Sequence, residues 1–437
     1  MATQFYALHS SQQRPSFQHF TSALLYLLIG LCLIGQAVEK LYTPNLLFPL
    51  IALQTVRLMR RPFDDSLALS TGVSFLVLYA VYGPNLLIFD RVDPSITIAL
   101  FILFCDAMKA FSRKSFRDEY LANSSARCWY LWVGLGGSCL SVPVVYSVAQ
   151  RSDLGLIVPL AFAVFFQESL LRAGVGKYKA YIALSMVEIS LLSYALFLWS
   201  GYGRLAVASL FLLPFAVHSA YRPTILRFWH FVVALPVLVI IANVVRGGAM
   251  GDVTSNVAVG VTDHMRLTED LRSGFYVGSG QIQAFVDQYL LFFLNWFPRD
   301  SWPTKPIGAG LYAVDLFWGR SRYGEDHNVS LGFVGDQIFT LGGWYILGLF
   351  AILATIIVIR HTLARYSGTI RHAPLIAFDA MLLTYFWGGM ASFGARVWFA
   401  VLPLIALALI SRVMTGGGKK GLGFAGLMSG ARDCPRM

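Results

Sequence analysis

The sequence predicts an all-α polytopic membrane protein with about 12 transmembrane helices and one large extracytoplasmic loop before the last three spans. Three observations predict this class. The 437 residues are 57% hydrophobic and 13% charged, whereas a soluble domain carries about 25% charged residues. The mean hydropathy is +0.63. Apolar stretches of spanning length recur along the chain, and Lys and Arg gather on one side of them. An ordinary soluble enzyme is therefore excluded.

A helix that crosses the bilayer needs about 20 mostly apolar residues. The stretches that meet this requirement are 20–38, 41–56, 66–89, 94–108, 129–149, 154–171, 180–199, 205–219, 228–245, 342–359, 374–391 and 395–411. The second and fourth are short for spans. The first has an alternative interpretation as a signal peptide, because Gly35 and Ala37 resemble a small-residue cleavage site.

These spans divide the chain into four regions. A nine-span membrane bundle covers 1–245, a large periplasmic loop with short helices covers 246–341, a three-span segment covers 342–411, and a cytoplasmic tail covers 412–437. Within the loop, residues 281–297 are apolar and aromatic but too few for a span. We expect this stretch to form a re-entrant or interface-lying helix.

The distribution of basic residues predicts the orientation. With the N-terminus in the cytoplasm, 22 of the 34 Lys and Arg fall on the cytoplasmic side, and only five fall in short outside loops. The other seven lie in the 246–341 loop. This bias is the positive-inside pattern, so the net charge of +11 reflects topology and predicts no nucleic-acid partner. None of the five cysteines lies in the loop, so no disulfide or thiolate metal site is expected there.

Four acidic residues fall inside predicted spans. Glu168 has Arg172 one turn away, which predicts an ordinary i,i+4 ion pair. Asp106 and Asp379 lie near cytoplasmic span ends, and we expect them to reach the lipid headgroups. Glu188 lies close to mid-span, where either a functional role or a structural hydrogen bond fits.

Several motifs that would indicate other chemistry are missing. There is no Asp-x-Asp, no P-loop and no closely spaced His pair. We therefore expect no metal, nucleotide or other cofactor.

One histidine stands out in the loop. His327 follows Glu325 and Asp326 and precedes Asp336, so nearby carboxylates could tune its basicity. Imidazole accepts protons near neutral pH, which makes His327 a candidate general base. The alternative is a loop histidine that bonds a backbone carbonyl.

The extracytoplasmic cations are candidate ligands for phosphate, because the planar guanidinium matches its oxygens. Those in the loop are Arg246, Arg266, Arg272, Arg299, Lys305, Arg320 and Arg322. Each could instead pair with one of the ten loop carboxylates. Arg396 is placed in a turn of about four residues between the last two spans, where a charge needs a role or a partner.

Two segments resemble a known family. Residues 297–306, Phe-Pro-Arg-Asp-Ser-Trp-Pro-Thr-Lys-Pro, resemble the Pro-Arg-x-x-Trp-Pro-x-Lys-Pro loop of bacterial O-antigen and exopolysaccharide repeat-unit polymerases. His327-Asn328-Val-Ser-Leu331, with Gly335, Asp336 and the Gly342-Gly343 pair, is similar to a stretch of the O-antigen ligase and polymerase superfamily. Arg299 and Gly310 match its Arg-x10-Gly feature. Many members have Glu where this chain has Asp336.

The resemblance implies a metal-independent glycosyltransferase of the bacterial inner membrane, with cytoplasmic termini and a periplasmic active site. Its substrate would be a polyprenyl-diphosphate oligosaccharide within the membrane lipids, and a chain-length regulator protein is a further partner to test for. The implied catalytic residues are His327 as base and Arg299 at the diphosphate. The implied substrate-binding residues are Lys305, Arg320, Arg322, Arg396, Asn328, Trp302 and Asp336. The helix at 281–297 would border a lateral opening for the lipid tail.

Two alternatives stay open. An O-antigen ligase would transfer the glycan to lipid A–core, and a polysaccharide flippase would transport the lipid-linked unit. The Trp-Pro-x-Lys-Pro sequence favours a polymerase over a ligase, and the large late loop argues against a flippase.

Overall fold

The computed structural model describes residues 15–38, 46–60, 63, 65–80, 95–111, 204–221, 229–232, 281–317, 330–367 and 372–416, together with scattered positions between 160 and 192. Within these ranges all regular structure is helical and no strand occurs, as the predicted fold class requires. The predicted span 129–149, most of the span 228–245 and the tail beyond residue 416 lie outside the described residues.

The helices of the N-terminal half follow the predicted apolar stretches closely. Their bounds are α2 Pro15–Val38, α3 Leu47–Arg60, α4 Ser66–Phe75 with a π-helical continuation Leu76–Ala80, α6 Ser95–Phe111 and α11 Arg204–Tyr221. The prolines at 44 and 49 explain the late start of α3, because proline is tolerated only in the first turn of a helix.

The C-terminal half contains α14 Gln281–Leu294, the short 3-10 helix η3 Arg299–Ser301, α15 Ala309–Phe317, α17 Gly332–Leu341, the 3-10 helix η4 Gly342–Trp344, α18 Tyr345–Ser367 and α19 Ala373–Gly416. The helix expected at 281–297 is thus present as α14. Residues 298–308 connect α14 to α15 and contain η3.

Two stretches of the described helices are long and apolar enough to cross a membrane. They are Gly332–Arg365, with a mean hydropathy of 2.2, and Ala373–Ile410, with 2.1. Only 28% of the most apolar window in the first stretch is buried. Large apolar side chains of α18, such as Leu347, Phe350 and Val358, are exposed. Such exposure fits a helix that faces lipid better than the core helix of a soluble protein.

Helix α19 reverses direction at Gly389. The backbone there is non-helical, with φ 74° and ψ −167°, and this left-handed φ favours glycine. The ring centroids of Phe378 and Phe393 are 5.5 Å apart, whereas fifteen residues of straight helix would separate them by about 22 Å. Residues 373–388 and 390–416 are therefore the two arms of a helical hairpin, and its tip is Gly389.

A second reversal joins α17 to α18 through η4. The side-chain oxygen of Gln337 lies against Gly348, where a Cβ atom would collide with it. A straight helix would hold these two residues about 16 Å apart. α17 consequently packs beside α18 instead of extending it, and the span predicted at 342–359 corresponds to α18 alone.

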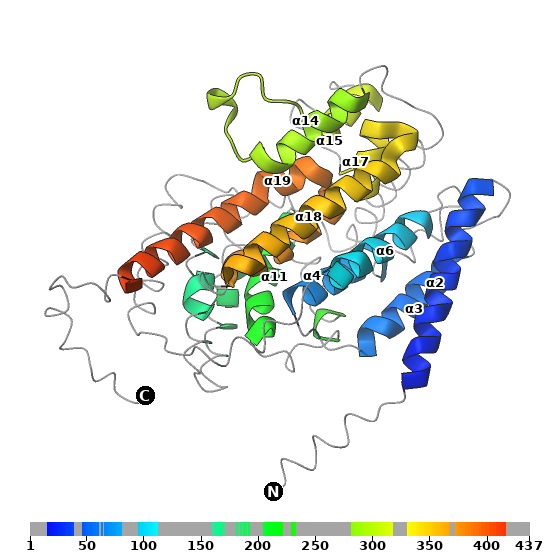
Figure 1. The fold of residues 1–437 in the computed structure, drawn as a ribbon, viewed down its shortest axis with the longest axis horizontal. Helices are drawn as coiled ribbons and strands as arrows, with labels where there is room; N and C mark the ends of the chain where they lie inside the picture. The colour runs from blue at the N-terminus through cyan, green and yellow to red at the C-terminus, as the bar shows by residue number, and fades with distance from the viewer. Residues whose placement is uncertain are drawn as a thin grey trace, which may run out of the picture.

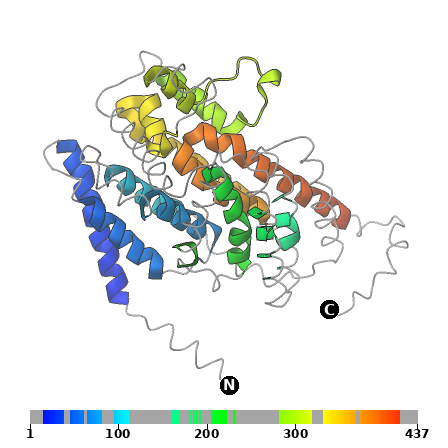
Figure 2. The same ribbon diagram turned by 180° about the vertical axis from the view of Figure 1, so that it is seen from behind.

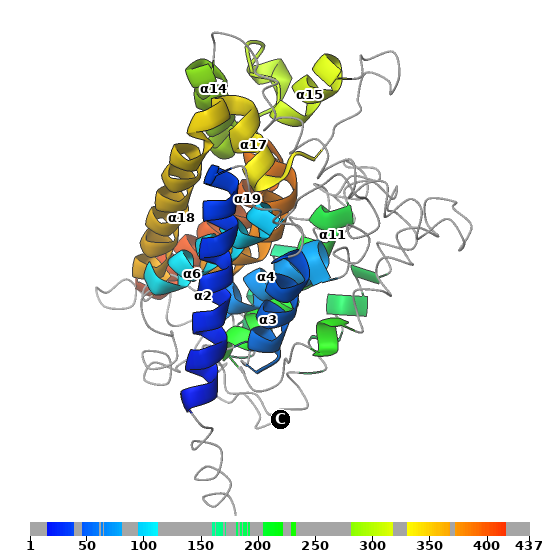
Figure 3. The same ribbon diagram turned by 90° about the vertical axis from the view of Figure 1, so that its right-hand side faces the viewer.

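The helices pack around α19 (Figure 1). Helix α11 packs along α19 on the side seen in Figure 2, and α4, α14 and α17 also contact it. Helices α2 and α3 lie together at one flank, next to α6. Figure 3 shows α14, α15 and α17 gathered at one end of the molecule, which is also the end where α19 reverses.

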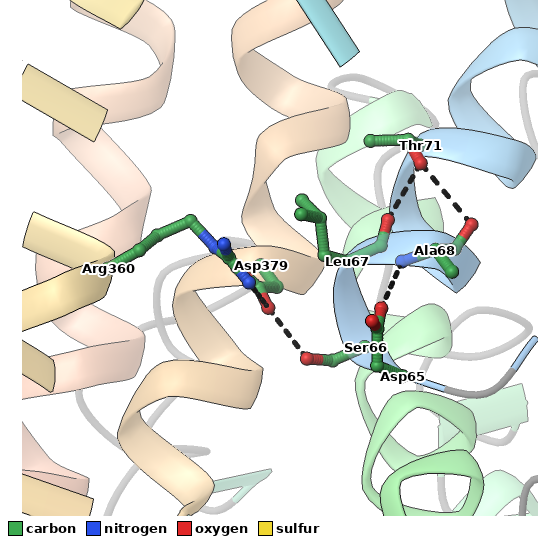
Figure 4. Close-up of polar contacts among 7 residues, drawn as sticks. All are labelled: Asp65, Ser66, Leu67, Ala68, Thr71, Arg360 and Asp379. Atoms are coloured by element: carbon green, nitrogen blue, oxygen red, sulfur yellow. Dashed lines mark hydrogen bonds and ion pairs between the residues drawn. The ribbon is translucent and has the colours of Figure 1, made fainter. Parts of the chain in front are cut away.

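A buried ion pair joins three helices toward the other end. Arg360 of α18 donates from Nε to Asp379 Oδ1 at 2.6 Å and from Nη2 to Asp379 Oδ2 at 3.1 Å. Ser66 of α4 donates to the same Oδ2 at 2.6 Å (Figure 4). Asp379 is fully buried. The prediction that it reaches the headgroups is wrong, because its charge is neutralised inside the protein.

Two other acids of the predicted spans also have protein partners. Asp106 accepts two hydrogen bonds from Arg57, at 2.6 and 3.0 Å, and one from the Tyr26 hydroxyl at 2.8 Å. Glu168 accepts from the Tyr221 hydroxyl at 2.6 Å and from the backbone N–H of His372 at 2.9 Å. Its predicted partner Arg172 lies outside the described residues.

Candidate functional site

The candidate site lies where the loop 298–308 packs onto the tip of the α19 hairpin. The side-chain amide of Asn295 donates to the backbone oxygen of Ala391 at 2.6 Å. Gly308, at the far end of the loop, also lies against Ala391. Both ends of the loop are therefore fixed to the first turn of the second arm.

Arg299 and Lys305 fold this loop by binding its own carbonyl groups. The Arg299 guanidinium donates to the backbone oxygens of Lys305 at 2.9 Å and Pro306 at 3.1 Å. The Lys305 amine donates to those of Asn295 at 2.7 Å and Phe297 at 2.8 Å. The two cations expected to bind diphosphate thus also hold the loop in shape.

The positive charges of these two residues are not neutralised by a described carboxylate. The expected alternative, a pairing with loop acids, does not occur for either residue among the described part of the chain. Partial burial lowers the pKa of Lys305, and the nearby Arg299 guanidinium lowers it further. A carbonyl accepts a hydrogen bond but does not cancel a charge, so the pair retains its attraction for an anion.

Arg396 lies in the second arm of the hairpin, not in the turn. Its Nη1 donates to the backbone oxygen and the hydroxyl of Ser392, both at 3.1 Å. The predicted turn between the last two spans exists, but it lies at Gly389, seven residues before Arg396. A helix accommodates this arginine because a residue one turn earlier supplies its acceptors.

Asp336 connects α17 to the tip. Its Oδ2 accepts the backbone N–H of Met390 at 2.8 Å, and the residue is 2% exposed. A carboxylate at this place satisfies one of the first N–H groups of the second arm and complements the positive end of its dipole. This contact gives Asp336 a part in the hairpin that the family resemblance did not predict.

Of the remaining residues implied by the resemblance, the structure describes only Trp302. Trp302 is half-buried in the loop, where its backbone oxygen accepts the N–H of Lys305 at 3.0 Å. The others, His327, Asn328, Arg320 and Arg322, lie outside the described residues. The structure therefore groups Arg299, Lys305 and Trp302 in the loop and places Asp336 on the hairpin tip at Met390, whereas Arg396 lies seven residues beyond Gly389 along the second arm.

Sequence reasoning missed two residues that position this site, Gln288 and Asn295. The buried Gln288 amide donates to the backbone oxygen of Ile307 and accepts from the N–H of Ala309, both at 2.9 Å. The signal was available, because two polar amides seven residues apart in an apolar stretch lie on one face of a helix. They attach the loop to α14 and α14 to α19.

The described part of the chain contains no group of three or more His, Cys, Asp or Glu side chains arranged to hold a metal ion. Comparisons with family models, with curated proteins and with solved structures find no match to this chain.

Proposed function

We propose that this protein is a membrane glycosyltransferase that polymerises polyprenyl-diphosphate-linked oligosaccharide repeat units into surface polysaccharide. The single observation that carries the proposal is the docking of the loop that holds Arg299 and Lys305 onto the tip of the α19 hairpin, whose second arm carries Arg396. A reaction that releases polyprenyl diphosphate needs cations placed in advance near the leaving group. The loop cations would provide them at one end of apolar helices.

In the proposed reaction, a hydroxyl of the incoming repeat unit attacks the anomeric carbon of the growing chain. The bond between that carbon and the diphosphate breaks, and the diphosphate leaves with the bonding electron pair. His327 accepts the hydroxyl proton, while Arg299, Lys305 and Arg396 stabilise the charge that develops on the phosphate oxygens. The diphosphate ester is already activated, so no nucleotide is required.

The packing of the flanking helices supports the role of His327. Its segment, 318–329, connects α15 to α17. These two helices pack against each other, with the rings of Tyr312 and Phe339 5.8 Å apart, and α17 also contacts α14 and α19. Both flanking helices therefore belong to the group of helices that packs at the end where α19 reverses.

Two groups of long-range polar contacts support the proposed periplasmic location of the site. The contacts at the hairpin tip join only residues that the predicted alternation of spans puts outside the membrane or at its outer surface. The pairs Arg360–Asp379 and Arg57–Asp106 join only residues predicted near the cytoplasmic side. If the predicted alternation of these spans were wrong, these contacts would join residues predicted on opposite sides of the membrane.

The proposal is tested in a strain that lacks this protein and still makes lipid-linked repeat units. We expect single repeat units on the cell surface, and long polymer after complementation with the wild type. His327→Ala should fail to restore polymer. His361→Ala should restore it, because His361 is an exposed histidine of α18 toward the other end of the molecule.

Other phenotypes would refute the proposal. Polymer that accumulates on polyprenyl diphosphate would indicate a ligase, and repeat units trapped in the cytoplasmic leaflet would indicate a flippase. Full polymer length with His327→Ala would remove the assigned base.

A further inference from the structure

The reversal of α19 depends on a contact between a buried acid and a glycine. Gly389 has a φ of +74°, and a Cβ atom there would lie 2.7 Å from Asp336 Oδ2. Its lack of a side chain lets the carboxylate approach the backbone of the tip. Met390, the next residue, begins the second arm and donates its N–H to that carboxylate at 2.8 Å.

The first N–H groups of a helix have no partner within the helix. In surroundings without water, each unsatisfied group costs free energy, and Met390 is fully buried. The Asp336 carboxylate satisfies its N–H and neutralises part of the positive helix end. The acid therefore fixes the position at which the second arm starts.

The second arm carries the contacts that dock the cationic loop. Ala391, one residue after Met390, accepts the Asn295 side chain, and the backbone oxygen of Asn295 accepts the Lys305 amine. Gly308, at the far end of the loop, also lies against Ala391. A shift of the first turn would therefore move the docking point of the loop that carries Lys305 and Arg299.

From these contacts we infer that Asp336 is a positioning residue, which sets the place at which the loop carrying Arg299 and Lys305 docks by fixing the start of the second arm. The inference rests on the proposed function for its effect on turnover, but not for its effect on geometry. Asp336 itself is 2% exposed, so it acts through the arm and not by touching the substrate.

The geometric test uses a disulfide as a reporter of loop docking. A Cβ atom on Gly308 would lie 3.2 Å from that of Ala391, which is close to the spacing of a disulfide. In full-length protein carrying Gly308→Cys and Ala391→Cys, we expect rapid cross-linking with a mild oxidant. Mass spectrometry of the linked peptide measures it without interference from the native cysteines.

Asp336→Asn should slow this cross-linking about tenfold or more, because the amide loses the charge and half of its acceptor capacity. Met390→Pro removes the same hydrogen bond from the donor side, and proline is tolerated at the first position of a helix. It should have a similar effect. If Asp336→Asn fails to fold, the cross-linking rate of Met390→Pro tests the inference instead.

The matched control is Thr340→Val. Thr340 lies on α17, like Asp336, and is buried to a similar extent. Thr340 is 1% exposed, and its hydroxyl bonds only carbonyls of its own helix, those of Asp336 and Gln337. It should leave the cross-linking rate unchanged. An unchanged rate in Asp336→Asn, or an equal loss in Thr340→Val, overturns the inference.

Turnover provides an independent readout of this positioning role. A displaced catalytic group can cost up to about 100-fold in rate, so Asp336→Asn should lower kcat by about 10- to 100-fold, with a smaller change in KM. In an Arg299→Gln background it should cost little more, because both changes remove the same loop charge from the leaving group. Losses that multiply would show that Asp336 does not act through the loop cations. If the wild type polymerises nothing, the proposed function fails while the cross-linking test still stands.

Discussion

At the scale of single residues, carboxylates recur at the beginnings of helices. Asp65 accepts the N–H of Ala68 in the first turn of α4, Glu168 accepts that of His372 just before α19, and Asp336 accepts that of Met390. Each carboxylate meets the positive end of a helix dipole where N–H groups lack partners. In apolar surroundings, such a carboxylate satisfies an N–H group that has no partner within the helix. The positive end of the helix dipole in turn stabilises the negative charge of the carboxylate.

The charge of Arg299 can be separated from its hydrogen bonds. Arg299→Gln keeps N–H donors for the loop carbonyls but removes the charge, whereas Arg299→Ala removes both. If the charge stabilises the leaving diphosphate, both variants should lose at least about tenfold in kcat/KM, measured by polymer formation from purified protein. Arg365→Gln, a change at an exposed arginine of α18, is the control. Near-wild-type activity of Arg299→Gln would reduce Arg299 to a loop-folding residue.

The buried pair at the other end makes a prediction about stability. Asp379→Ala leaves Arg360 as an uncompensated buried charge and should cost about 3–5 kcal/mol in the free energy of unfolding. Asp379→Leu combined with Arg360→Met should recover most of this loss, because no charge then remains buried. Denaturant unfolding in detergent measures both variants. A double variant as unstable as the single one would contradict this explanation.

At the scale of elements, the site is built by the close approach of α14 to the second arm of α19. The Trp398 indole donates to the backbone oxygen of Phe292 at 2.9 Å, and the rings of Phe292 and Phe393 lie 5.0 Å apart. Gly394 permits this approach, because a Cβ atom there would collide with the backbone oxygens of Leu291 and Phe292. The loop cations are thus held by the contact between two helices.

Gly394→Ala should separate α14 from α19 and displace the loop. We expect loss of polymer formation, together with slower cross-linking between cysteines at 308 and 391. Gly343→Ala is the matched control, since no atom lies within 4 Å of a Cβ added there. It should behave like the wild type. Equal polymer formation and equal cross-linking in Gly394→Ala and Gly343→Ala would show that the site does not require the close approach of α14 to α19.

At the scale of the whole molecule, the locations of helices could be predicted well from the sequence. The side chains that pair with one another across the fold could not. The apolar runs gave α2, α6, α11 and α18 within a few residues at most ends, because hydropathy alone determines which stretches avoid water. The burial of Asp379 could not be foreseen, since its partner Ser66 is 313 residues away. The same holds for Asp336 and Met390, which are 54 residues apart. Arg396 was predicted to lie in a turn because a charged residue inside a span needs a partner. Its partner, Ser392, lies one helical turn earlier, and this proximity follows only from the helical structure.

The two ends of the molecule should lie on opposite sides of the membrane. Thr304 is exposed in the loop near the hairpin tip, and His361 is exposed on α18 toward the other end. In intact spheroplasts, a membrane-impermeant maleimide should label Thr304→Cys, but label His361→Cys only after permeabilisation. Labelling of both from outside would contradict the proposed orientation.

The most direct measurement is polymerisation by the purified protein in lipid nanodiscs, supplied with a defined polyprenyl-diphosphate repeat unit and a metal chelator. The loop cations and the activated diphosphate predict a ladder of products that differ by one repeat unit, with release of polyprenyl diphosphate. Unchanged substrate under these conditions, or product formed only when a divalent metal or a nucleotide is added, would contradict the proposed function.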